Sequence, residues 1–290
     1  MTGSAMWVFV LLGTLSLERF YPFTLYLVGS VKKSDLIRLT QTPNILPMPN
    51  AYHSYKIFPD MPHSSMVKVE GGSFMMESDS EDDDNPLREI EVSSFYLGQY
   101  PVSQGLWKRV MGNNPAKFQG NEQLPIEKVT WYDALEFCNR LSELLGLEAA
   151  YEIDTSHIDQ RQWLAKRKEG ALGYRLPTDA EWEYAARGGK YSKAFTYSGS
   201  NKLKEVAWNA ENSFFEPNPV GCKRPNELGI YDMSGNVREW CADEDQYQQA
   251  LRGGSWLNSV VSCRVSARDR NVPGIRYINV GFRVAGYLKP

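Results

Sequence analysis

The chain has 290 residues, 42% of them hydrophobic, which is enough to bury a large core as one domain or as one domain plus an extension. Its formal net charge of −3 and its pI of about 5.8 argue against the basic face that nucleic-acid binding needs, so no nucleic-acid partner is expected. Four cysteines show no zinc spacing, and their even number permits two disulfides without requiring them. We expect mostly free thiols at Cys138, Cys222, Cys241 and Cys263.

Residues 1–65 are predicted to form an N-terminal extension, of which residues 1–6 resemble a cloning scar. Two apolar runs, Trp7–Leu17 and Phe20–Gly29, are shorter than the roughly 18–20 residues that span a bilayer, so we expect two strands and no membrane span. No signal or lipidation motif is visible in this chain. Residues 32–65 are punctuated by Pro and Asn and are expected to wrap the main body as extended segments.

Residues 66–290 are predicted to form the main domain. Val67–Met76 and Ile90–Tyr100 are predicted strands. The acidic segment Glu77–Asn85 between them is predicted to be a solvated loop, with calcium binding as the alternative. Residues 148–173 are expected to form a polar insertion.

Three helices are predicted from an N-cap residue at one end and a glycine stop at the other. The N-caps are Ser103, Thr130 and Thr178, and the stops are Gly112, Gly146 and Gly188. Cys138 falls on the apolar face of the second helix and is expected in the core. In the third helix Glu181 completes a capping box with Thr178, and Glu183 is expected at the surface, so the two glutamates are not predicted to be an acid–base pair.

The segment Leu251–Gly286 is the part that the rest of the domain is expected to present. Its ends, RGGSW at 252–256 and GFRVA at 281–285, predict rigid structure, with Trp256 and Phe282 in the core. The 24 residues between them, 257–280, have no apolar period typical of a helix or a long strand, so a displayed loop is predicted. This loop contains no Lys, Glu, Gln, Met or Trp.

Several motifs resemble one family: PVS at 101–103, RLPTDAEWEYAARGG at 175–189, NELGIYDM at 226–233, GNVREW at 235–240 and the terminal GFRVA. Over about residues 66–287 the chain resembles the formylglycine-generating-enzyme family. The resemblance implies an α+β, C-type-lectin-like fold that is loop-rich, with two main helices and irregular antiparallel sheets. Periodicity alone predicts only a loop-rich α+β protein.

The enzymes of that family hold copper with two thiolates, which suit Cu(I). The matching positions are Asn258 and Cys263, so one ligand is missing and we expect no copper and no enzymatic activity. The family's disulfide also loses a partner, because Val284 stands where Cys138 would find its cysteine.

The family's calcium loop matches two carboxylates and two backbone carbonyls, the hard oxygen ligands that Ca²⁺ takes. These predicted ligands are Asp232, Gly235, Val237 and Glu239. Calcium is therefore a candidate cofactor. The alternative is that Glu239 and Asn236 only hydrogen-bond the loop.

The pattern RGGSW…CR…R…P…R…GFRVA also resembles the variable region, about residues 251–286, of proteins diversified by diversity-generating retroelements. In such proteins, Asn codons of the AAY type are randomised to NNY codons, which cannot encode Lys, Glu, Gln, Met or Trp. These are the five residue types absent from 257–280. The alternative is that a surface loop of this family lacks them by chance. The positions implied to vary and to bind ligand are Leu257, Asn258, Ser259, Val261, Ser262, Ala267, Asp269, Arg270, Asn271, Val272, Ile275, Tyr277 and Ile278. Cys263, Arg264, Arg268, Pro273 and Arg276 would be framework.

Together the resemblances predict a ligand-binding display protein, exported or at the cell surface, whose surface at about residues 257–280 is diversified. Its partner would be a protein or another surface ligand. The alternatives are a formylglycine-generating-type oxidase, which Asn258 disfavours, and a fixed adaptor domain of the same fold.

Overall fold

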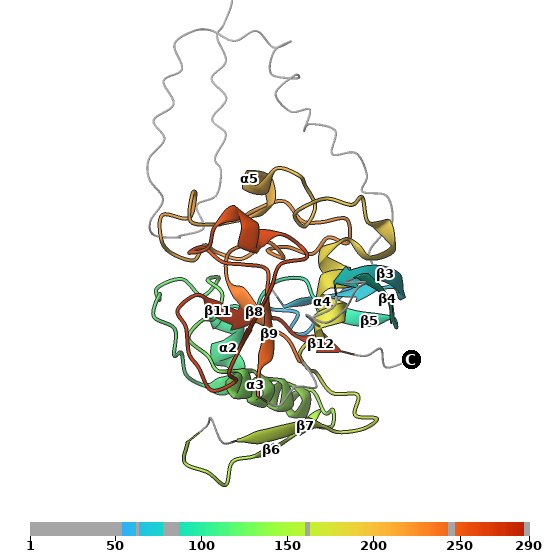
Figure 1. The fold of residues 1–290 in the computed structure, drawn as a ribbon. Helices are drawn as coiled ribbons and strands as arrows, with labels where there is room; N and C mark the ends of the chain where they lie inside the picture. Colours follow the sequence, from blue (N-terminus) through green and yellow to red (C-terminus); the bar gives the residue numbers. More distant parts are fainter. Residues whose placement is uncertain (1–53, 62–63, 78–86, 160–162, 243–246, 287–290) are drawn as a thin grey trace, which may run out of the picture. The chain divides into compact units, whose positions relative to one another are not determined.

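The computed structural model describes residues 54–61, 64–77, 87–159, 163–242 and 247–286 (Figure 1). The described residues all belong to one compact unit, Ala51–Pro290. The strands predicted within residues 7–29, the segment 1–6 and all of the acidic loop except Glu77 lie outside the described residues. No helix in the described part of the chain is long and apolar enough to cross a membrane.

The first sheet joins the beginning and the end of the described chain. Its strand order is β1 (Ser54–Lys56), β2 (Ser65–Val69), β5 (Phe95–Gly98) and β12 (Ala285–Gly286), with all neighbours antiparallel. Every residue of β5 is buried, as expected for a central strand. Because β1 belongs to this sheet, the domain begins before the predicted boundary at Met66.

The second sheet contains a strand from the predicted display loop. Its order is β10 (Arg268–Asn271), β9 (Gln249–Arg252), β8 (Arg238–Trp240) and β11 (Val280–Phe282). The β8–β9 and β9–β10 pairs are antiparallel, whereas β11 runs parallel to β8. The sequence of β10, RDRN, has no apolar alternation, so its pairing leaves no periodic signal and 257–280 is predicted only as loop.

Two hairpins complete the strands. The β3 (Gly72–Glu77) and β4 (Leu87–Val92) pair lies where strands are predicted, whereas the β6 (Tyr151–Asp154) and β7 (Leu164–Arg167) pair lies in the predicted polar insertion. None of the residues in β7 is fully buried, so that strand lacks the alternation that would have predicted it.

The three predicted helices are confirmed as α2 (Gln104–Met111), α3 (Trp131–Leu144) and α4 (Asp179–Ala186). The structure adds the single turns α5 (Leu203–Val206), η2 (Gly189–Tyr191) and η3 (Val260–Cys263). The Ser103 side chain accepts from Leu106 N, and Thr130 and Thr178 each complete a capping box. These caps satisfy backbone N–H groups that the first helical turn leaves without a partner.

The core is built on the apolar face of α3. Five residues of that face have 0% exposure: Ala134, Leu135, Phe137, Cys138 and Leu141. This burial confirms the prediction that Cys138 is a core residue.

An aromatic cluster holds β11 against the helices, and α3 lies beside β8, β9 and β11 in Figure 1. The ring of Phe137 is stacked with that of Trp107, with centroids 5.5 Å apart, and meets that of Phe282 edge-on at 5.2 Å. Phe282 is fully buried and Trp256 is 3% exposed. Both are therefore core residues, as predicted.

Candidate binding surface

None of the thirteen predicted variable positions is buried, although Trp256 and Val280 on either side of the segment are. Four of the apolar side chains are about half exposed: Leu257 at 47%, Val261 at 55%, Val272 at 41% and Tyr277 at 48%. Exposed apolar and aromatic side chains are typical of binding patches. As ligand contacts, the thirteen positions stay a prediction.

Backbone atoms anchor the segment to the rest of the domain. Four hydrogen bonds of 3.0 Å join it to separate segments: Ala210 N to Asn258 O, Val265 N to Thr196 O, Lys128 N to Tyr277 O and Trp131 N to Pro273 O. The ladder between β10 and β9 adds further backbone pairing. Since every residue has a backbone carbonyl and every residue except proline an N–H, this anchoring depends little on side-chain identity.

Arg238 brings two of the predicted variable positions together. Its Nε donates to Asn258 Oδ1 at 3.1 Å, and its Nη1 pairs with the carboxylate of Asp269. Asn258 Oδ1 also accepts from Ser255 Oγ at 2.6 Å. Asn258 is therefore part of a supporting network and is not a free display position.

The structure also shows how far Ile275 and the predicted framework residues are buried. Ile275, predicted to vary, is half-buried and packs against the core. Of the predicted framework residues, Cys263 and Pro273 are buried, whereas Arg264 is exposed. Arg276 is exposed but forms an ion pair of 2.7 Å with Asp133 in the first turn of α3.

Two exposed aromatic residues beside this surface were missed by the sequence analysis. Phe214 and Phe215 are 87% and 69% exposed, with left-handed φ angles of 59° and 62°. Ser213 Oγ donates to Trp256 O at 2.8 Å and ties their loop to the start of the segment. Non-glycine residues with positive φ are uncommon and strained. The only signal is an apolar pair within the polar stretch ENSFFEPN.

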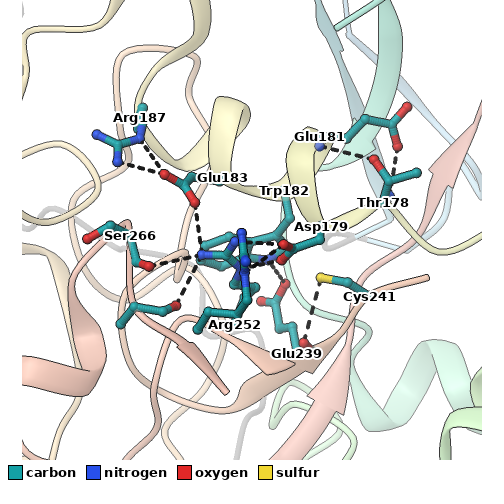
Figure 2. A network of polar contacts seen from close by, with 12 residues as sticks. Thr178, Asp179, Glu181, Trp182, Glu183, Arg187, Glu239, Cys241, Arg252 and Ser266 are labelled. Carbon is teal, nitrogen blue, oxygen red and sulfur yellow. Dashed lines mark hydrogen bonds and ion pairs between the residues drawn. The ribbon is translucent and has the colours of Figure 1, made fainter. Parts of the chain in front are cut away.

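A buried ion network joins α4 to β9, with Arg252 between Asp179 and Glu183 (Figure 2). Arg252 has no exposed surface; it forms a double ion pair with Asp179, and its Nη1 lies 2.9 Å from Glu183 Oε2. Arg268 Nε lies 2.8 Å from Asp179 Oδ2, so the same carboxylate joins α4 to β10. The prediction that Glu183 lies at the surface is wrong, because it is 1% exposed and pairs with Arg252, which is distant in sequence, as well as with Arg187 one turn later.

The predicted calcium ligand Glu239 is committed to other partners. It is fully buried, and its carboxylate accepts from Arg283 Nε at 2.6 Å, Arg283 Nη2 at 2.7 Å and Trp182 Nε1 at 2.7 Å. A carboxylate neutralised by a guanidinium is a poor calcium ligand. As arranged, the four residues do not fit the predicted site.

Asp232 and Asn236 hydrogen-bond other backbone segments of the same loop region. Asp232 Oδ2 accepts from Gly221 N at 2.7 Å, and burial raises the pKa of this carboxyl to about 6. Oδ1 of Asp232 is buried and has no hydrogen-bond partner among the described residues. Asn236 exchanges two hydrogen bonds of 3.0 Å with the backbone of Asn218. Asn236 thus hydrogen-bonds the loop, whereas Asp232 keeps one buried oxygen without a partner, and calcium binding stays a prediction.

The two positions that match the family's copper ligands hold Cys263 and Asn258. All four cysteines lie in the described part of the chain, and none of them forms a disulfide there. Burial raises the pKa of Cys263 to about 12, so its thiol is protonated at neutral pH. At the other matching position, Asn258 offers only an amide. One neutral thiol cannot replace the two thiolates that Cu(I) favours.

The fold is that of a C-type-lectin-like domain of the formylglycine-generating type, as predicted. Residues 54–287 match the family described as the Sulfatase-modifying factor enzyme 1-like domain, and the chain belongs to this family.

Two relatives and one solved structure place the chain within that family. It is 44% identical over 233 residues to the chaperone protein LppX of Paenibacillus barcinonensis, covering 69% of this chain and 81% of the relative. It is 29% identical to the inactive C-alpha-formylglycine-generating enzyme 2 of Bos taurus, over 76% of this chain and 87% of the relative. The structure of Treponema denticola variable protein 1 superposes with a TM-score of 0.67 at 33% identity, over 77% of this chain and 95% of that structure.

Proposed function

We propose that this protein is a ligand-binding display protein whose C-terminal surface, about residues 257–280, is diversified by a retroelement. Its ligand is a protein or another surface molecule, met outside the cell or at the cell surface. The similarity to a structure named as a variable protein supports the proposal. The absence of five residue types from 257–280 supports it independently.

The observation that carries the proposal is the way the segment is anchored. Backbone hydrogen bonds and a short ladder hold it in place, while the predicted variable side chains are exposed or half-buried. At the exposed positions among them, such as Leu257 and Val261, substitutions usually change stability by within about 0.5 kcal/mol, whereas Asn258, Asp269 and Ile275 contact supporting residues. A surface built in this way accepts many sequences on one scaffold.

Genomic DNA provides the direct test. We expect a reverse-transcriptase gene nearby and a near-repeat of the segment that encodes Asn at the thirteen positions. In genes from independent isolates, substitutions should concentrate at those codons. A locus with neither the repeat nor the reverse transcriptase would refute diversification.

We further propose that the chain is not a formylglycine-generating oxidase. Asn258 replaces one thiolate position, and one relative is named as an inactive enzyme of this type. Titration should show no stoichiometric Cu(I) binding, and a sulfatase-type cysteine peptide should remain unconverted. Tight Cu(I) binding that disappears in Cys263→Ser would contradict this.

A fixed binding domain of the same fold is the second candidate, favoured by the 44% identity to a protein named as a chaperone. It differs from the first candidate in where variation falls. A fixed domain would show substitutions spread over its whole surface among isolates, with no excess at the thirteen positions.

A further inference from the structure

The aromatic side chains of Phe214 and Phe215 lie exposed to solvent, side by side in the chain. Their exposed fractions are 87% and 69%, so neither ring is packed in the core. Both residues also have left-handed φ angles, a conformation that costs free energy for most residues other than glycine. An apolar ring in water is unfavourable as well. Neither feature stabilises the folded domain, which points to a role in binding.

The loop that carries the two phenylalanines is held on both sides. Ser213 Oγ, directly before them, donates to Trp256 O at 2.8 Å and accepts from Phe215 N at 3.3 Å. On the other side, Asn218 N donates to Asn236 Oδ1 at 3.0 Å. Only four residues lie between Ser213 and Asn218. The backbone therefore presents the rings in a preorganised arrangement, which reduces the entropy lost when a ligand binds.

This loop borders the start of the segment that is predicted to vary. Ala210 N donates to Asn258 O at 3.0 Å. Ser213 is bonded to Trp256 O, two residues earlier in the same segment. Leu257 lies between these two points of contact and is 47% exposed. The phenylalanine pair and the first variable side chains therefore belong to neighbouring parts of one surface.

The charges beside the pair are acidic. Glu211 and Glu216 are exposed, and residues 210–219 contain no Lys or Arg. Anionic lipid headgroups attract Lys and Arg and would be repelled by such a loop. A symmetric contact between two copies of the loop would bring like charges together. A protein with an apolar pocket and basic groups at its rim matches both the rings and the charges.

We propose that Phe214 and Phe215 form a fixed aromatic anchor, which inserts into an apolar pocket with a basic rim on the protein ligand of the variable surface. The inference rests on the proposed function, because it adds a constant contact to the same surface. The pair lies outside residues 257–280, so it stays the same while the segment changes. The anchor supplies affinity common to all variants, and the variable side chains supply selectivity.

Selection from two matched libraries tests the anchor. The full chain is displayed on yeast with NNY codons at the thirteen positions. One library keeps both phenylalanines, and the other carries Phe214→Ser and Phe215→Ser. Both are selected against lysozyme, a basic protein, and the Kd of the enriched clones is measured. Clones that keep the phenylalanines should bind at least about tenfold more tightly, and introducing the two serines into them should remove this gain.

Leu144→Ser is the matched control, because Leu144 is 59% exposed at the end of α3 and lies outside the loop and the variable segment. It should leave the Kd of the same clones unchanged. The double serine variant should keep the Tm of the unaltered protein, because the two rings are exposed.

Equal affinities from the two libraries would overturn the anchor and leave the display function intact. A failure of both libraries to yield binders would count against the display function itself and therefore against the anchor. Two further assays compare the unaltered protein with the double serine variant. Sedimentation velocity would reveal a dimer that the serines abolish, and vesicles of phosphatidylcholine and phosphatidylglycerol would reveal lipid binding that they abolish. Either result would overturn the proposal, because it assigns the pair to a second copy or to a lipid surface.

Discussion

Replacing Glu239 with glutamine removes one charge of a buried pair and leaves the other. The side chains of Glu239 and Arg283 both have 0% exposure, and three N–H groups donate to the carboxylate. Glutamine accepts through one oxygen only and presents an NH₂ group to the guanidinium. Breaking a buried ion pair from one side costs about 3–5 kcal/mol, because the remaining charge stays desolvated.

Thermal unfolding followed by circular dichroism measures this cost. For a domain of this size, 1 kcal/mol corresponds to about 2–4 °C, so Tm should fall by about 6–20 °C. Glu122→Gln is the matched control: Glu122 lies 3.7 Å from Lys108 with both side chains exposed, and such pairs contribute about 0–1 kcal/mol. Adding Arg283→Met to Glu239→Gln should cost less than the sum of the single changes.

The same scans with a chelator separate the ion pair from calcium. If Glu239 pairs with Arg283 and binds no calcium, Tm of the unaltered protein is the same with and without chelator. If Glu239 binds calcium, removing the ion costs about 2.7–4.1 kcal/mol at 100–1,000-fold excess over Kd. The reasoning is refuted if Glu239→Gln behaves like Glu122→Gln, or if only the unaltered protein responds to chelation.

Three further predictions test burial and capping. In urea unfolding, Phe282→Ala should lower the free energy of unfolding by about 3–5 kcal/mol. Tyr277→Ser on the exposed surface should lower it by under about 1 kcal/mol. Similar losses would show that the stability of the domain depends on the surface side chains as much as on the core. Iodoacetamide at pH 8 should label the exposed Cys222 and spare Cys263, because burial raises the pKa of the Cys263 thiol to about 12. Peptide mass spectrometry measures the labelling, and equal labelling of the two cysteines would contradict the prediction. Thr178→Ala should cost about 1 kcal/mol in the same urea assay, through loss of the α4 cap; no change would contradict that role.

The helices were predictable because their signals are local. Ser103, Thr130 and Thr178 each accept a hydrogen bond from a backbone N–H three residues later, so cap and partner lie within one turn in the sequence. The burial of Cys138 follows from the same short-range periodicity. The lectin-like arrangement of the sheets required the family resemblance.

The unpredicted parts depend on partners far away in the chain. Glu183 is buried because Arg252 reaches it from β9, and Glu239 is taken by Arg283 from beyond β11. The strand β10 exists because β9 supplies its hydrogen bonds, although its own side chains carry no alternating pattern. In each case the residue can be read from the sequence, but the distant residue or strand with which it pairs cannot.

The order of strands has a consequence for synthesis of the protein. β11 and β12 come from the last residues of the described chain, yet they pair with β8 in one sheet and with β5 in the other. The growing chain therefore cannot complete either sheet until it has been translated beyond residues 257–280. A message that stops or shifts frame within that segment yields a chain without β11 and β12, whose exposed core would direct it to degradation.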